Sequence, residues 1–273
     1  MSRAASIVRR DGSARVAVIG GGAIGGAVIS ALREGRLPGV EPVALVDDRP
    51  VQGAGVPQVD LATALDRADV VVECAGQAVV AQSAAGILDH GVDLLVTSVG
   101  ALCDPAVADA VAAAGPGRLL LTSGAAGGLD ILSAAAAQAP LTRVAVTTAK
   151  LPATLVQPWM DGPAAARLRG TDRPVEVFTG GAREAARLFP RSLNLAATVG
   201  WAVGDLDLVE VRLMADPSAA LTRHLIEAEG PSGAYRFEIQ NLPSPENPRT
   251  SGVVPYAVLR SLAALAGRPS GVI

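Results

Sequence analysis

The glycine-rich segment after the first apolar run constrains the fold of this chain more than any other feature. Residues 15–19 form a short apolar run typical of a buried strand, and helix-forming residues occupy 27–34. Between them, Gly20, Gly22 and Gly25 have the spacing G-x-G-x-x-G. In that order the glycines permit a tight turn, a close approach of the backbone to a pyrophosphate, and close packing of helix on strand. The segment therefore predicts a strand, a turn and a helix that bind a dinucleotide.

Strands and helices alternate through the first half of the chain. Further apolar runs predict strands at 43–46, 69–73, 93–98 and 118–122, and helices are predicted at 61–65, 79–89 and 129–138. This alternation is typical of a parallel sheet with helices on both faces. The N-terminal part is thus expected to be an α/β, doubly wound Rossmann domain.

The pattern changes from residue 142 onward. Strands are predicted at 142–149, 206–215, 221–229 and 234–240, and helices at 182–188 and 193–203. Because the last three strands follow each other closely, we expect them to be antiparallel neighbours. The C-terminal part is therefore predicted to be an α+β domain with a mostly antiparallel sheet. A final helix at 254–266 is expected to pack against the first domain.

Chain length and these patterns together predict two domains, since 273 residues exceed one core of ordinary size. We expect a flexible N-terminal tail at 1–13 and an NAD(P)-binding domain at 14–123, completed by the C-terminal helix within 252–273. Residues 124–251 are expected to form a domain for substrate binding and dimerisation. The apolar strands of that domain suggest a sheet shared between the subunits of a homodimer.

Composition narrows the class of partner. The net charge is −3 with scattered basic residues, so a small molecule is expected rather than nucleic acid, which needs a basic face. Apolar residues make up 50% of the chain but in segments shorter than a bilayer requires, which predicts a cytoplasmic protein that does not bind a membrane. Cys74 and Cys103 are expected to be buried thiols, and no metal site is expected.

The second predicted strand ends in an acidic residue, where a Rossmann domain binds the ribose of its cofactor. Asp47 follows that strand directly, which favours NAD over NADP, while the neighbouring Arg49 leaves NADP possible. Ala23 and Ile24 in the glycine motif are further candidates for cofactor binding. Ala75 lies at the carboxyl edge of the sheet, where the nicotinamide half of the cofactor is expected; a polar loop that only ends the strand is an equal alternative.

Beyond the glycine motif, several segments in order along the chain resemble the aspartate dehydrogenase family. The segments that carry the resemblance are 20–25 (GGGAIG), 97–102 (TSVGAL), 123–130 (SGAAGGLD), 194–197 (NLAA), His224 and 245–251 (PENPRTS). Together they span nearly the whole chain. The family oxidises L-aspartate with NAD or NADP to iminoaspartate, which hydrolyses to oxaloacetate and ammonia or enters the early steps of NAD biosynthesis.

The resemblance also implies roles for single residues. Ala125 and Asn194 are expected to contact the cofactor near its nicotinamide end, and His224 to be the catalytic residue. Asn194 has a second interpretation as the N-cap of the helix that follows it. Without the resemblance, a lone histidine in a strand is more often a packed or surface residue. His90, at a predicted helix end, is assigned no chemistry.

Substrate-binding residues are predicted from chemistry alone. A dicarboxylic substrate needs basic and hydrogen-bonding partners. Lys150, at the end of a predicted strand, is the first candidate, followed by Arg249 with Thr250 and Ser251. Exposed salt bridges are the competing interpretation of the basic residues. A histidine that titrates near neutrality suits the transfer of the amine proton and the hydrolysis of the imine.

Two other functions fit these patterns. A dehydrogenase or imine reductase of the same build can act on another small amino or imino acid, because pocket residues decide the substrate. A regulatory protein that senses NAD(H) needs the glycine motif but has no use for His224.

Overall fold

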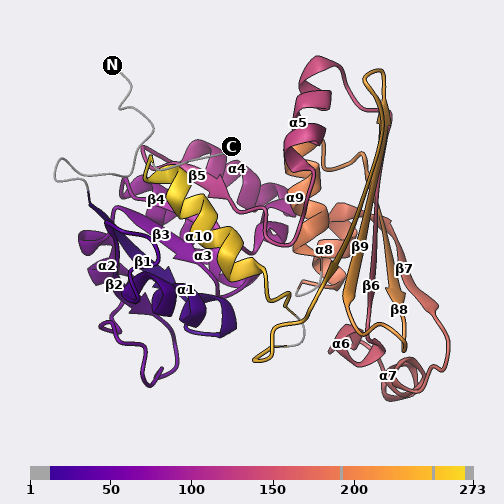
Figure 1. Cartoon of the computed structure of the whole chain (residues 1–273), viewed down its shortest axis with the longest axis horizontal. Helices are drawn as coiled ribbons and strands as arrows, with labels where there is room; N and C mark the ends of the chain where they lie inside the picture. The colour runs from indigo at the N-terminus through magenta and orange to yellow at the C-terminus, as the bar shows by residue number, and fades with distance from the viewer. Residues whose placement is uncertain (1–12, 191–192, 248–249, 268–273) are drawn as a thin grey trace. The chain divides into compact units, whose positions relative to one another are not determined.

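The computed structural model describes residues 13–190, 193–247 and 250–267, which form two compact units (Figure 1). The described part of the first unit comprises 13–101, 105–124 and 254–267. The second unit comprises 102–104 and the described residues between 125 and 253. Residues 102–104, placed in the first domain from the sequence, thus cluster with the second unit.

The first unit is a Rossmann-type layer of five parallel strands, which confirms the predicted fold class. The sheet order is β2-β1-β3-β4-β5. Its strands are β1 (Ala14–Ile19), β2 (Val40–Val46), β3 (Val70–Glu73), β4 (Asp93–Val96) and β5 (Leu119–Leu121). Its helices are α1 (Ala23–Arg33), α2 (Leu61–Arg67), α3 (Gln77–Asp89), α4 (Pro105–Ala113) and α10 (Val254–Leu265), with a 3-10 turn at Val99–Cys103.

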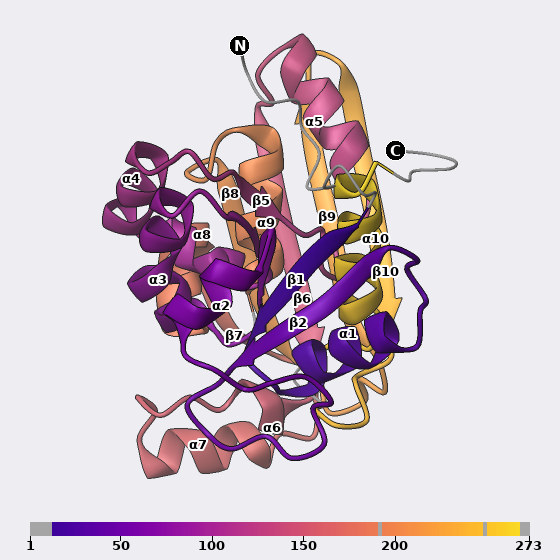
Figure 2. The same cartoon turned by 90° about the vertical axis from the view of Figure 1, so that its left-hand side faces the viewer.

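Helices cover both faces of this sheet because its strands are apolar on both sides. Val16 and Val18 of β1 pack in one cluster with Val28 of α1 and with Val258 and Leu262 of α10. The last helix therefore shares the core of the first unit and lies beside α1 (Figures 1 and 2). Helices α2 and α3 contact the sheet from its other side.

The second unit contains a mixed sheet of five strands in the order β10-β9-β6-β8-β7, three of whose four pairings are antiparallel. The strands are β6 (Arg143–Lys150), β7 (Val175–Gly181), β8 (Val209–Ala215), β9 (Thr222–Gly230) and β10 (Gly233–Asn241). The helices are α5 (Leu129–Gln138), α6 (Pro152–Leu155), α7 (Gly162–Arg169), α8 (Ala182–Leu188) and α9 (Asn194–Val203). The expectation that the last three strands are antiparallel neighbours is confirmed for β9 and β10 but was wrong for β8, because β6 lies between β8 and β9.

One face of this second sheet carries the core of the unit. Alternate residues of the central strands, such as Val144, Val211 and Ile226, pack against helices α5, α8 and α9. The residues between them in sequence face away from these helices. The two faces therefore differ: one is buried under helices, and the other carries charged side chains.

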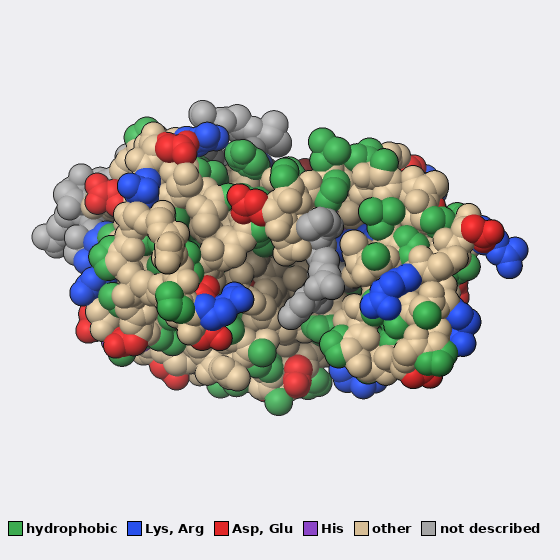
Figure 3. Space-filling view, turned by 90° about the horizontal axis from the view of Figure 1, so that it is seen from below, with side chains coloured by type: hydrophobic (Ala, Val, Ile, Leu, Met, Phe, Trp, Pro, Cys, Tyr) green, Lys and Arg blue, Asp and Glu red, His purple; other side chains and the backbone are tan. Residues whose placement is uncertain are grey.

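Three observations on the described residues concern binding to membranes, to metal ions and to charged partners. No described helix is long and apolar enough to cross a membrane. Among the described residues, no three His, Cys, Asp or Glu side chains group in a way that holds a metal ion. On the face shown in Figure 3, basic and acidic side chains are interspersed.

Candidate active site

The carboxyl ends of β1 and β3 meet where the connections of the first sheet change direction. Because β1 lies between β2 and β3, the chain leaves β1 toward one side and then crosses to the other. Open α/β sheets bind ligands at such a switch point. Gly20 follows β1 and Ala75 follows β3; a Cβ atom on Gly20 would lie 2.9 Å from the backbone of Ala75. Gly20 also has a φ of +95°, so position 20 requires glycine and brings these two candidate residues together.

The other two glycines of the motif differ in what surrounds them. A Cβ atom on Gly25 would collide with the carbonyl oxygen of Gly20, so close packing of α1 on the turn requires this glycine. A Cβ atom on Gly22 would meet nothing within 4 Å among the described residues. Gly22 is the N-cap of α1, and Ala23 and Ile24 form its first turn. Open space beside a helix N-terminus suits a pyrophosphate, so these residues fit a dinucleotide cofactor.

Asp47, the residue after β2, is tied to the glycine turn. Its Oδ2 accepts a hydrogen bond from the Gly21 amide at 2.8 Å and its Oδ1 accepts one from the Arg49 amide at 3.0 Å. Burial alone would raise the pKa of Asp47, but these backbone bonds and the charge of Arg49 hold it below its ordinary value. The Asp47 side chain is 6% exposed, whereas that of Asp48 is 92% exposed. An ionised acceptor therefore lies at the position where Rossmann domains bind a ribose hydroxyl.

Glu73, the last residue of β3, was not among the site residues predicted from the sequence. Its carboxylate is 1% exposed and accepts hydrogen bonds from the backbone amides of Ala75, Gly76, Thr97 and Ser98 and from the Ser98 hydroxyl, at 2.7 to 3.3 Å. These donors lie in the loops that follow β3 and β4. Glu73 thus holds the Ala75 loop in place, and an acidic residue closing an otherwise apolar strand was its only sequence signal.

In the second unit, polar side chains replace apolar ones at one end of the helix-covered sheet face. Thr148 and Lys150 continue the buried face of β6, and Thr222 and His224 continue that of β9. Thr148 pairs directly with His224 across the two strands. The strand register therefore brings together residues that are more than seventy positions apart.

His224 is held in one orientation and kept neutral. Its side chain is 3% exposed, and its Nδ1 lies 2.9 Å from the Thr148 hydroxyl. Burial, with a smaller contribution from the charge of Lys150, lowers the pKa of His224 to about 3. The imidazole is therefore uncharged at neutral pH and has its Nε2 left for other chemistry.

Lys150 is the buried cation of this cluster. It is 6% exposed at the end of β6, and burial lowers its pKa to about 8. At neutral pH the ammonium group is mostly charged despite its burial. A buried cation beside a neutral histidine suits the binding of an anionic substrate.

Ala125 and Asn194 lie at the same end of the second sheet. Helix α9 packs on β8 and is joined to it by the short segment 204–208, so Asn194 at its N-terminus lies near the end of β8. Ala125 packs against the core of this unit, and the nearby Gly127 lies against Ile239 of β10. The interpretation of Asn194 as an N-cap was wrong, because Leu193 occupies that position and makes no side-chain cap hydrogen bond.

The three remaining substrate candidates come from the segment after β10. Ser251 forms an isolated antiparallel bridge with Pro243, which returns the chain to the end of β10. Ser251 is 6% exposed, and Thr250 is partly exposed. Arg249 lies outside the described residues.

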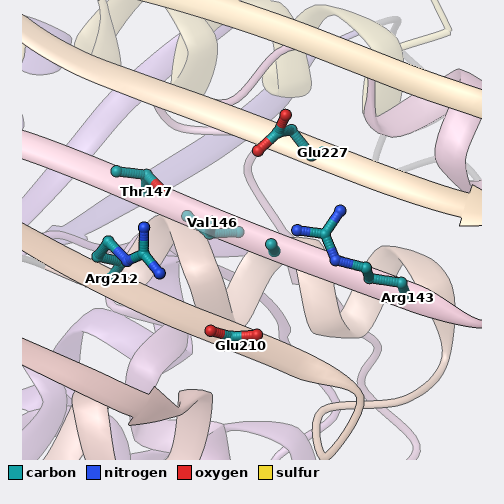
Figure 4. Close-up of a pocket in the computed structure, with 7 residues that line it drawn as sticks. Arg143, Val146, Thr147, Glu210, Arg212 and Glu227 are labelled. Atoms are coloured by element: carbon teal, nitrogen blue, oxygen red, sulfur yellow. The ribbon is translucent and has the colours of Figure 1, made fainter.

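The opposite face of the second sheet has a shallow hollow with different chemistry. Figure 4 shows Arg143, Thr147, Glu210, Arg212 and Glu227 around it, on strands β6, β8 and β9. None of the candidate site residues in the described part of the chain lines it. The hollow is therefore separate from the His224 cluster.

The two cysteines are protonated thiols in this structure. Cys103 is buried, and burial raises its pKa to about 11. Cys74 is only partly buried, so the expectation of a buried thiol was wrong there; desolvation and the neighbouring Glu73 still raise its pKa. Both thiols stay protonated at neutral pH and are poor nucleophiles.

Comparison with protein families matches both parts of the chain. Residues 130–265 match the model described as "Aspartate dehydrogenase, C-terminal". Residues 20–116 match the model described as "Homoserine dehydrogenase, NAD binding domain".

Comparison with individual proteins covers nearly the full length. The chain is 37% identical to the L-aspartate dehydrogenase of Methanopyrus kandleri, over 89% of this chain and 93% of that protein. It is 39% identical to the L-aspartate dehydrogenase of Ruegeria pomeroyi, over 91% of each. The crystal structure of aspartate dehydrogenase from Thermotoga maritima aligns with a TM-score of 0.75 and 28% identity, over 95% of this chain and 98% of that one. The chain therefore belongs to the aspartate dehydrogenase family and is an NAD(P)-dependent amino-acid dehydrogenase.

Proposed function

We propose that the protein oxidises L-aspartate with NAD(P)⁺ to iminoaspartate, NAD(P)H and a proton, and that water then converts the imine to oxaloacetate and ammonia. The reaction is reversible. The observation that carries the proposal is the buried pair of a neutral His224 and a charged Lys150, which joins a base to a carboxylate-binding cation. The relatives named L-aspartate dehydrogenase support this choice of substrate.

His224 is proposed to move the proton on the substrate nitrogen. Its Nδ1 and the Thr148 hydroxyl share a hydrogen bond, in which either group can donate. When Nδ1–H donates to Thr148, the Nε2 lone pair is available to take a proton from the substrate ammonium. The same Nε2 then returns a proton during hydrolysis of the imine. Thr148 thereby fixes the orientation of the ring and can accept from Nδ1–H in the tautomer that the reaction needs.

Lys150 is proposed to hold a substrate carboxylate. Burial is the main cause of the low pKa of His224, and the charge of Lys150 lowers it further. A bound carboxylate offsets the charge of Lys150, so substrate binding makes the imidazole a stronger base. Thr250, Ser251 and Arg249 are proposed to donate to the same substrate. A bound nicotinamide supplies the hydride acceptor.

The cofactor is proposed to be NAD, with NADP accepted less well. The ionised Asp47 favours a ribose with a free 2′-hydroxyl and repels a 2′-phosphate. The Arg49 side chain is 82% exposed beside it and offers the phosphate a partial counter-charge. Gly20, Gly22, Ala23, Ile24, Gly25 and Ala75 are proposed to bind the cofactor, as are Ala125 and Asn194 near its nicotinamide.

The test follows reduced-nicotinamide absorbance with L-aspartate and either cofactor, and with oxaloacetate and ammonium in reverse. The wild type should turn over, and His224→Ala should lower kcat by about 10²- to 10⁴-fold while binding NADH as before. His90→Ala is the matched control, since His90 is half exposed near Asp66, and should keep full activity. If the protein oxidises another amino acid but not L-aspartate, that amino acid is the substrate and the proposal is wrong on this point. NADH binding without any turnover would favour a sensor.

A homodimer is proposed to form through the open face of the second sheet. Charges alternate there, as in Arg143 with Glu229 and Arg212 with Glu176, so a second copy turned by a two-fold axis can match them. Leu225 lies near the centre of this face, opposite Thr147. Light scattering should give a dimer for the wild type and a monomer for Leu225→Arg. A monomeric wild type at micromolar concentration would contradict the proposal.

A further inference from the structure

The last residue of β10 carries an unsatisfied buried donor. The Nδ2 atom of Asn241 is inaccessible to solvent and has no hydrogen-bond partner among the described residues. The residue as a whole is partly exposed, so it lies at the surface with its amide nitrogen turned inward. Leaving such a donor unpaired costs free energy that an apolar side chain would not cost. A donor in this state indicates a partner that the protein alone does not provide.

Asn241 lies on the same sheet face as His224. It alternates with Phe237 and Ile239, which pack on the core beneath the helices. Asn241 pairs with Thr222, and Ile239 pairs with His224. Asn241 is therefore two residues further along β10 than Ile239, the residue opposite His224, and its side chain lies on the same face of the sheet.

The same level of the sheet holds Lys150. Thr148 and Ala149 pair with His224 and Arg223, so Lys150 and Thr222 come next along β6 and β9. Asn241, Thr222 and Lys150 thus form one row across three adjacent strands. The row combines an amide, a hydroxyl and a cation, which are all donors to an anion.

The loop after β10 adds a further donor beside this row. The Gly252 amide donates to the carbonyl oxygen of Leu242 at 3.0 Å, and Ser251 bridges Pro243. These contacts bring the buried Ser251 back to the position where Asn241 ends the strand. Asn241 is therefore close in sequence to the residues that this loop contacts, and it shares a row of the sheet with Lys150.

We propose that Asn241 binds a substrate carboxylate by donating a hydrogen bond from Nδ2, and so helps to select dicarboxylates. This inference rests on the proposed function, because it places a second donor in the same substrate site. A neutral amide supplies directional bonding without adding another buried charge to the one on Lys150. Asn241 is thus a binding and specificity residue, and the proton transfer is left to His224.

The test compares Asn241→Leu and Asn241→Asp with the control Gln240→Leu. Gln240 is the neighbouring residue on the opposite, exposed side of β10. Both Asn241 variants should raise KM for L-aspartate by about 10- to 100-fold, the effect of losing one hydrogen bond to a charged group, and leave KM for NAD unchanged. Succinate, which has both carboxylates but no amino group, should raise the Tm of the wild type and of the control but not of Asn241→Leu. Without ligand, Asn241→Leu should melt at the wild-type temperature or above it.

The outcomes separate this inference from the proposed function. An unchanged KM in both Asn241 variants, with wild-type turnover intact, would overturn the role of Asn241 and leave the function standing. A large drop in the ligand-free Tm of Asn241→Leu with unchanged KM would also overturn it, because Asn241 would then be structural. Succinate binding that depends on Asn241, in a protein that does not turn over L-aspartate, would support the inference while the proposed function fails.

Discussion

The two candidate sites of this protein are built from different parts of the chain. At the carboxyl edge of the first sheet, the turn is formed by glycine backbone, and Asp47 and Glu73 accept hydrogen bonds from backbone amides. In the second unit, side chains from separate strands form the cluster, with Thr148 opposite His224. A site built from one local turn has a sequence signature. A site built from strand register has none until the sheet is known.

The largest expected effect tests whether burial of the histidine governs stability in acid. The pKa of His224 is about 3 in the folded protein and 6.5 ordinarily. As pH falls below 6.5 the unfolded chain takes up this proton first, so stability is lost toward pH 3. By about pH 4 the loss should be on the order of 3 kcal/mol. Urea unfolding at neutral pH and at about pH 4 should show a loss of stability that is larger by this amount for the wild type than for His224→Gln; equal losses would contradict the prediction.

The next largest effect concerns the positive charge of Lys150, which is proposed to bind a substrate carboxylate. Lys150→Gln should raise KM for L-aspartate by about 10- to 100-fold, because a charge-assisted hydrogen bond is lost. In the wild type, KM should rise as pH increases through about 8, where Lys150 loses its proton. The variant should lack this rise. The measurement is the pH profile of KM for L-aspartate, and a rise in KM of the same size in Lys150→Gln would assign the titration to another group.

A pair of glycine variants tests the backbone-built site. Gly22→Ala should leave Tm unchanged, since its Cβ meets open space, but should raise KM for NAD by about tenfold as the methyl obstructs the pyrophosphate. Gly25→Ala should lower Tm, because its Cβ collides with the Gly20 carbonyl. Thermal melts and NAD titrations distinguish the two. Loss of stability in Gly22→Ala with normal NAD binding would remove Gly22 from the cofactor site.

The smallest effect concerns cofactor choice. Asp47→Ser should shift the ratio of kcat/KM for NADP to that for NAD upward by about tenfold or less, because it removes the charge that repels a 2′-phosphate. Arg49→Ala should shift the same ratio downward. Initial rates with both cofactors measure the ratio. If neither variant changes it, this edge does not bind the ribose.

Much of the fold was predictable because its signals are local. The glycine spacing and the alternation of apolar strands with helices predicted the first sheet, and its strands match the predicted segments closely. Helices α4, α6 and α7 and strand β7 were not predicted. The neighbours of β8 were predicted wrongly, since adjacency in sequence does not show that β6 inserts between β8 and β9.

The site was predictable only in part, for the same reason. Gly20 and Asp47 stand in a recognisable turn, and His224 and Lys150 could be proposed from resemblance and chemistry. Thr148 and Asn241 could not, because their importance depends on the strands that lie beside them. Glu73 was missed because its partners are backbone amides, which no side-chain motif reveals.

The buried carboxylate of Glu73 has a dynamic consequence. The loops that follow β3 and β4 are separated in sequence, yet amides of Ala75 and Ser98 donate to the same side chain. When either loop opens, the buried carboxylate loses part of the donors that stabilise its charge, so local unfolding of this edge should be cooperative. In hydrogen exchange, the amides of both loops that donate to Glu73 should then show one common free energy of opening.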